Sequence, residues 1–188
     1  DLAYDRHRNT ATYNVNGGNI MTEYLHVTFG SRTVLQEVRN KNLERELLLM
    51  NDESDPEKYE LLEKTTDKNS VFTVPVSYEI ISSHGDTDEL RGWMSFTFIT
   101  LNDLERDNFI RRYKSTSIDI EAPGFISSYI LQSTTNSHEL VILSTWRLKK
   151  NWTDWQSSTN FPLRRYEHSQ YNLHRKQLSF TALAKQSL

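Results

Sequence analysis

The chain has 188 residues, of which 36% are hydrophobic and 11% aromatic, so it is long and apolar enough to fold around a core. Its 22 Lys and Arg side chains against 25 Asp and Glu give a formal net charge of −3, which excludes a strongly basic, general nucleic-acid binder. The absence of Cys excludes disulfides, thiolate metal sites and cysteine nucleophiles.

Residues 1–20 are polar, Asn-rich and without periodicity, whereas an ordered pattern begins at Met21. Gly17-Gly18 could be encoded by a purine run at the distance that a bacterial start codon uses. We therefore expect Met21 to be the initiator and residues 1–20 to be a disordered leader or added sequence. No apolar run approaches the roughly 20 residues of a membrane-spanning helix. The sequence predicts a cytoplasmic protein with no membrane and no nucleic-acid partner.

Residues 21–90 show the pattern of a smaller α+β extension. Alternating residues predict strands, and Pro75 marks a strand end or sheet edge because it lacks a backbone donor. The expected elements are a strand over 24–29, a helix over 34–40, strands over 46–50 and 59–63, a β-rich stretch over 71–76, a helix or strand from 78 to 82, and a linker over 83–89.

Residues 91–188 show a clearer pattern, with β-α-β-β-α-β order, which is typical of a ferredoxin-like α+β unit. Met94, Phe96 and Phe98 face away from the helices, so this face needs a covering partner. The partner is either the extension or a second chain. The expected elements are a strand over 93–101, a helix over 102–117, strands over 125–131 and 139–146, a helix carrying the stripe Leu148, Trp152 and Trp155, a helical piece after Asn160, and a strand over 177–183.

The run VILSTWRLKKNWTDWQSSTNF (141–161), preceded by EAPGF (121–125), resembles the antibiotic biosynthesis monooxygenase (ABM) family, in particular its haem-degrading branch. VFTVPVSYEII (71–81) resembles the junction of the extension in two-part members, which are bacillus-type haem-degrading monooxygenases and TRAP-type signal-transduction proteins. The resemblance implies a ferredoxin-like sheet in a dimeric α/β-barrel, formed by a homodimer or by an intramolecular pseudo-dimer.

The resemblance also implies three site residues in haem-degrading members, namely an Asn, a Trp and an iron-ligating His. The Trp corresponds to Trp155, the Asn to Thr97 and the His to Arg165. Thr97 retains a hydroxyl donor, but the guanidinium of Arg165 has no free lone pair for iron. His168, three residues later on a continuing helix, is the possible haem-iron ligand; the alternative is an ordinary surface histidine. Trp155 and Thr97 are either catalytic or simply packed in the core.

Charge is distributed unevenly along the chain. Residues 147–176 hold seven basic and two acidic side chains, whereas residues 44–67 hold nine acidic and three basic ones. A basic rim containing Arg164 and Arg165, beside Phe161, suits a planar acid such as haem, whose propionates pair with guanidinium groups. The alternative is two solvated faces.

Two functions follow from the resemblance. The first is an ABM-type monooxygenase acting on haem or another planar aromatic small molecule, with haem as substrate and no other cofactor. The second is a non-catalytic regulatory or ligand-binding protein of the TRAP type. Thr97 and Arg165 favour the second function, whereas Trp155 and His168 favour the first.

Overall fold

Eight antiparallel strands close into one barrel, in the order β1-β3-β2-β8-β5-β7-β6-β4. The computed structural model describes residues 21–116, 118 and 122–180; the predicted leader and residues 181–183 of the last predicted strand lie outside them. The strands are β1 (Glu23–Gly30), β2 (Leu48–Asp52), β3 (Tyr59–Thr65), β4 (Val76–Gly85), β5 (Trp93–Thr100), β6 (Phe125–Ser133), β7 (Glu139–Trp146) and β8 (His174–Phe180).

The barrel is built from two similar halves. In the first half the spatial order is β4-β1-β3-β2, and in the second it is β8-β5-β7-β6, so each half places its fourth, first, third and second strands side by side. This is the strand order of a ferredoxin-like unit, and the predicted α+β ferredoxin-like class is confirmed. The first half lies where a dimeric barrel would have a second chain, and its strands cover the open face of the second half.

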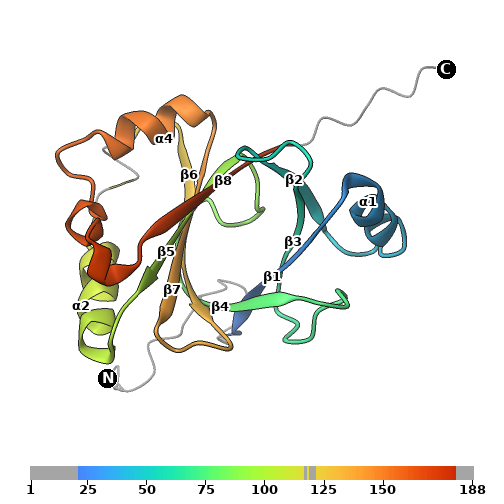
Figure 1. Ribbon diagram of the computed structural model, residues 1–188, viewed down its shortest axis with the longest axis horizontal. Helices are drawn as coiled ribbons and strands as arrows, with labels where there is room; N and C mark the ends of the chain where they lie inside the picture. The colour runs from blue at the N-terminus through green and yellow to red at the C-terminus, as the bar shows by residue number, and fades with distance from the viewer. Residues whose placement is uncertain (1–20, 117, 119–121, 181–188) are drawn as a thin grey trace.

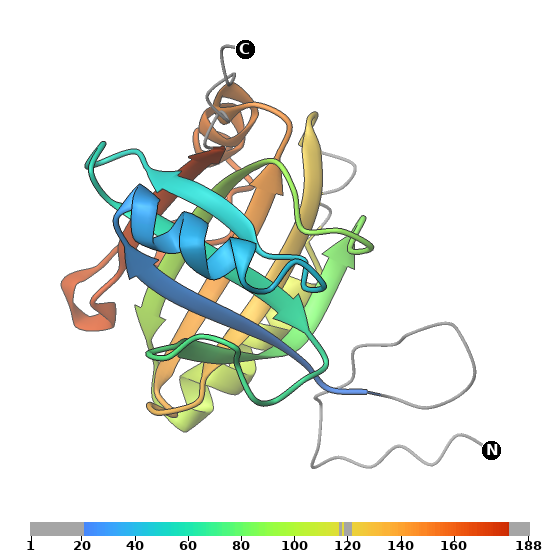
Figure 2. The same cartoon turned by 90° about the vertical axis from the view of Figure 1, so that its right-hand side faces the viewer.

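The helices lie outside the barrel on two opposite sides. Figure 1 shows α1 (Arg32–Asn40) on one side and α2 (Asp103–Lys114) with α4 (Lys149–Gln156) on the other. Figure 2 shows α1 lying across the outer face of the first half. Asn102 caps the start of α2, because its side-chain oxygen accepts a hydrogen bond from the Glu105 backbone N–H at 2.8 Å. No helix in the described part of the chain is long and apolar enough to cross a membrane.

Three apolar clusters follow from the alternation of the strands. One fills the barrel and contains Met94 and Phe96, with Phe98 packed against it, so these residues face away from the helices as predicted. The second lies between the second half and its helices. The third lies under α1, where Phe72, from the irregular segment between β3 and β4, packs with Leu35 and Leu61.

The two seams between the halves differ in length. β4 and β6 pair from Tyr78–Ser133 to Gly85–Ser127, with one irregularity in register. β2 and β8 pair only from Met50–Phe180 to Asp52–Leu178.

Several boundaries differ from the sequence prediction. Residues 71–75 form no strand, because Pro75 lacks a donor and Phe72 turns inward instead. The segment 78–82 is a strand, and the expected linker begins three residues later, since β4 continues to Gly85. The helical piece expected after Asn160 is a series of turns with two short 3₁₀ helices, η1 (Arg164–Tyr166) and η2 (Ser169–Tyr171).

Candidate functional site

A cleft of about 450 Å³ lies between α2 and the turns that follow α4. We call it the α2 cleft. Most of the residues that line it are aromatic or positively charged. The lining consists of Phe109, Arg112, Tyr113, Thr159, Asn160, Phe161, Pro162, Arg164, Arg165 and Tyr166.

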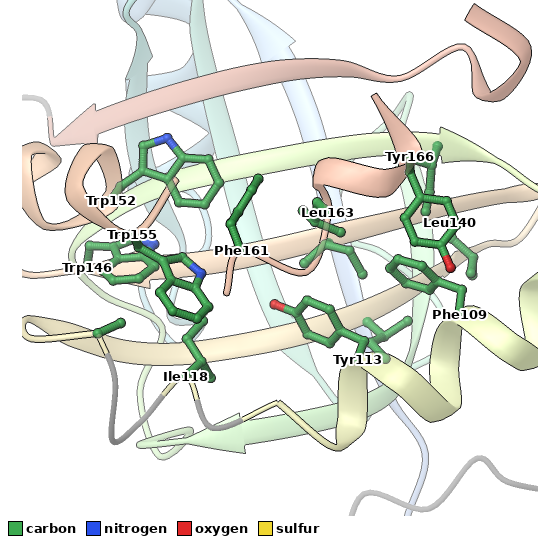
Figure 3. Close-up of a cluster of buried hydrophobic side chains, with 14 of the residues drawn as sticks. Phe109, Tyr113, Ile118, Leu140, Trp146, Trp152, Trp155, Phe161, Leu163 and Tyr166 are labelled. Carbon is green, nitrogen blue, oxygen red and sulfur yellow. The ribbon is translucent and has the colours of Figure 1, made fainter. Parts of the chain in front are cut away.

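The aromatic wall of the cleft is held by edge-to-face contacts. The ring of Phe161 lies 5.6 Å from Trp152 and 6.3 Å from Trp155, both on α4, while Tyr166 lies 5.0 Å from Phe109 on α2. Figure 3 shows Phe161 between the tryptophan group on one side and Tyr166 with Phe109 on the other. These T-shaped contacts fix rings that turns alone would leave free to rotate.

Turn hydrogen bonds hold the segment that carries Phe161 and Tyr166. The Phe161 N–H donates to the Ser158 carbonyl at 3.2 Å, and the Tyr166 N–H donates to the Leu163 carbonyl at 3.0 Å. Pro162 has no backbone N–H that would need an acceptor there, and its fixed φ favours a turn. The chain thus directs three apolar side chains inward without a continuous helix, since Phe161, Leu163 and Tyr166 are all buried.

The cleft is electrostatically one-sided, because three guanidinium groups and no carboxylate line it. Arg164 donates to the carbonyls of Gln156 and Ser158 at 2.6 and 3.1 Å, and its guanidinium carbon lies 5.8 Å from the Phe161 ring. Among the residues that the structure describes, Arg112 and Arg165 have no salt bridge and no side-chain hydrogen bond. Two exposed guanidinium groups are therefore available to an anion.

Tyr113 lines the cleft, but its hydroxyl is hydrogen-bonded to a residue that does not line it. Its hydroxyl lies 2.7 Å from Ser128 Oγ on β6, in a buried hydrogen bond. Burial raises the pKa of Tyr113 to about 12, although the bond to Ser128 acts in the opposite direction. Tyr113 is therefore neutral at physiological pH, and it can act as a hydrogen-bond donor or acceptor but not as a base.

The structure brings together only part of the predicted set. Phe161, Arg164 and Arg165 line the α2 cleft, whereas Thr97 and Trp155 lie beneath it as buried residues, 1% and 4% exposed. Thr97 is on the helix-facing side of β5, in register with Ile142 of β7 and Arg175 of β8. The roles predicted for these residues stay predictions.

His168 lies outside the residues that line the cleft. It is exposed and begins η2 with an extended backbone, so it does not continue a helix from Arg165 as expected. No imidazole lines the α2 cleft, and within the described residues no group of three His, Asp or Glu side chains could hold a metal ion. In this arrangement the lining residues do not fit iron ligation of haem.

The sequence prediction missed the contribution of α2 to the cleft. Phe109, Arg112 and Tyr113 are spaced i, i+3, i+4, so they lie on one helical face. The exposed arginine between Phe109 and Tyr113 was the signal that this face reaches a cleft open to solvent.

The cleft lies partly within the stretch of chain that matches a known family, because Phe109 to Pro162 fall inside that stretch whereas Arg164, Arg165 and Tyr166 follow it. Residues 97–162, from β5 to the turn after α4, match the family model described as antibiotic biosynthesis monooxygenase. Residues 97–162 of the second half are thus similar to this family. The resemblance inferred from the sequence is thus confirmed. A comparison with curated protein sequences finds no match.

Solved structures share the fold across both halves of the barrel, beyond residues 97–162. A Listeria monocytogenes ferredoxin-fold protein related to antibiotic biosynthesis monooxygenases has 19% identity and a TM-score of 0.73, covering 87% of this chain and 96% of that one. A major regulator of staphylococcal pathogenesis has 18% identity and a TM-score of 0.71, covering 85% and 99%. LmHde, a haem-degrading enzyme from Listeria monocytogenes, has 19% identity and a TM-score of 0.65, covering 84% and 99%.

Proposed function

We propose that the protein is an ABM-type monooxygenase that binds a planar aromatic acid in the α2 cleft. The observation that carries this proposal is the combination of an aromatic wall with three guanidinium groups and no carboxylate among the lining residues. A planar ring packs against Phe161, Tyr166 and Phe109, and its acidic group pairs with Arg112 or Arg165.

The chain's own groups position this substrate. Arg112 on α2 and Arg165 in η1 approach it from two elements, so an acid held by both is fixed in orientation as well as in place. An electron-rich aromatic substrate supplies all four electrons that reduce dioxygen: one oxygen atom replaces hydrogen on the substrate and the other leaves as water, so this proposal requires no external reductant and no resident cofactor.

Haem is the substrate that fits less well. Its propionates suit Arg164 and Arg165, but an iron ligand from His168 requires the segment 167–171 to move toward the cleft. An aromatic acid without a metal can bind to the lining residues of the α2 cleft without any movement of this segment.

A non-catalytic TRAP-like regulatory function is the second candidate. Fully buried Thr97 and exposed Arg165 occupy the positions where the resemblance implies a reactive Asn and His, and this favours ligand binding without oxidation. The fold shared with the staphylococcal regulator is compatible with this candidate.

Oxygen consumption with a defined probe separates the two candidates. We expect 1,4-dihydroxy-2-naphthoate, an electron-rich aromatic acid, to bind saturably and to raise oxygen uptake above the rate without protein. The matched control, 1,4-dihydroxynaphthalene, lacks the carboxylate and should bind more weakly. Saturable binding without added oxygen uptake supports the regulatory candidate, and equal binding of both compounds contradicts the role of the arginines.

Haem is tested in parallel by titration, with ascorbate added under air and catalase present. Saturable binding with a Soret band that His168→Ala alters, followed by loss of the band, would establish haem as substrate with His168 as ligand. No saturable binding would exclude haem and leave the metal-free aromatic acid.

A further inference from the structure

A second pocket, of about 570 Å³, lies on the α1 side of the barrel and shares no residue with the α2 cleft. We call it the linker pocket. It lies between the loop that follows α1, the end of β3, and residues 88–90 of the connection between the two halves.

The floor of the linker pocket is formed by leucines. Leu62 is fully buried, and Leu48 and Leu90 pack against the same cluster that fills the barrel, so the pocket opens onto the barrel core. Leu43 stands at the rim, where its side chain is 79% exposed. An apolar ligand body would remove the exposed surfaces of Leu43, Leu48 and Leu90 from water.

Two of the three cations that line the pocket are already paired. Arg45 donates to both carboxylate oxygens of Glu63, at 2.5 and 2.8 Å. Lys64 Nζ donates to the Thr87 carbonyl and lies 3.6 Å from a carboxylate oxygen of Glu23. These cations are thus neutralised by the protein itself, and Arg39 is the remaining one.

Three carboxylates at the rim lack such pairing. Glu46, Asp88 and Glu89 form no salt bridge with any residue that the structure describes. Against the single remaining guanidinium of Arg39, they give the opening a net negative charge. The α2 cleft has the opposite sign, with three guanidinium groups and no carboxylate.

We infer that the linker pocket is a second ligand site, for an organic ammonium ion whose apolar body covers the leucines and whose cationic head meets the rim carboxylates. This site is independent of the proposed oxygenase function. A ligand bound there contacts Asp88, Glu89 and Leu90 together with the first half, so it fixes the connection that joins the two halves.

The test uses the full chain and two probes that share one apolar body, 4-phenylbutylamine and the uncharged 4-phenyl-1-butanol. Calorimetric titration at pH 7 and low salt should give saturable, one-to-one binding of the amine, with binding of the alcohol at least about tenfold weaker because it lacks the charge that the rim carboxylates attract. No saturable binding of the amine, or equal binding of the alcohol, overturns the inference.

A pair of matched variants locates the site. Leu43→Lys places a cation at the rim, and Leu104→Lys places one on α2, where Leu104 is 74% exposed. Neither position is buried, so both variants should melt like the wild type. Leu43→Lys should weaken amine binding about tenfold and Leu104→Lys should leave it unchanged; equal affinities in the two variants contradict the assignment. Binding of dihydroxynaphthoate at the α2 cleft should not change with either probe, which keeps the two proposals separable.

Discussion

The ammonium group of Lys176 on β8 pairs with the carboxylate of Glu60 on β3, inside the barrel and across the intervening β2. The ammonium lies 4.9, 5.1 and 5.5 Å from the rings of Phe96, Phe29 and Phe98. This cluster lies beside the short seam between β2 and β8. Side chains thus join the two halves where backbone pairing is limited.

Glu60 makes stability depend on pH. Burial raises the pKa of Glu60 above its ordinary value of 4.5, and the attraction of Lys176 only partly opposes this. The folded chain then holds a proton that the unfolded chain has lost, so this contribution to stability is present below pH 4.5 and declines as pH rises toward the folded pKa. In Glu60→Gln this decline in stability with rising pH should disappear. The measurement is the free energy of unfolding in urea from pH 4.5 to 8. The exposed Glu57→Gln should keep the wild-type slope, and an unchanged slope in Glu60→Gln would contradict the assignment.

Trp155 supports the α2 cleft from below. Trp155→Ala removes a buried indole that contacts Phe161 edge to face, so the free energy of unfolding should fall by about 3–5 kcal/mol. Ligand binding should weaken too, because Phe161 loses its support. Trp155→Phe should recover part of both losses in denaturant melts and probe titrations. A Trp155→Ala protein of wild-type stability would contradict the packing described here.

Position 124 requires glycine, because of the backbone conformation there and because of the neighbouring side chain. Its φ is +82°, and an added Cβ would lie 2.2 Å from the side chain of Asn151. Asn151 Oδ1 accepts a hydrogen bond from the Leu148 N–H at 3.1 Å, at the start of α4. Gly124→Ala should therefore lower the free energy of unfolding by about 1–3 kcal/mol, measured by denaturant unfolding. Gly30→Ala, whose Cβ would meet Leu35 at 3.3 Å, is the control with a smaller expected loss.

The arginines of the α2 cleft should determine affinity for acids. Arg112→Gln and Arg165→Gln should each weaken binding of dihydroxynaphthoate about three- to tenfold, and have little effect on binding of the uncharged naphthalene diol. Fluorescence titration of the two ligands measures both effects. Arg147→Gln removes an exposed arginine outside the cleft and should change neither.

Regular alternation and helical periodicity predicted most of the fold from the sequence. The β-α-β-β-α-β order after Trp93 and the inward face of Met94, Phe96 and Phe98 were predicted because both depend on local periodicity. The closure of the barrel by the first half was not decided, since pairing between β2 and β8 joins residues far apart in the chain.

The α2 cleft was predicted only in part, for a similar reason. Phe161, Arg164 and Arg165 were identified because they are close together in sequence, whereas Arg112 comes from a distant helix. His168 was expected to continue a helix, but the turns after Pro162 direct it elsewhere. Turns of this kind depend on tertiary contacts, as the buried rings of Phe161 and Tyr166 show.

Phe72 gives the barrel its asymmetry. In the first half it packs with Leu35 of α1, on the helix side that in the second half holds the α2 cleft. A pair of identical subunits would present every site twice, and each substitution would alter both copies. Joining the halves in one chain allows them to differ, so Phe72 fills this side of the first half whereas the α2 cleft stays open in the second, and each substitution alters one half alone.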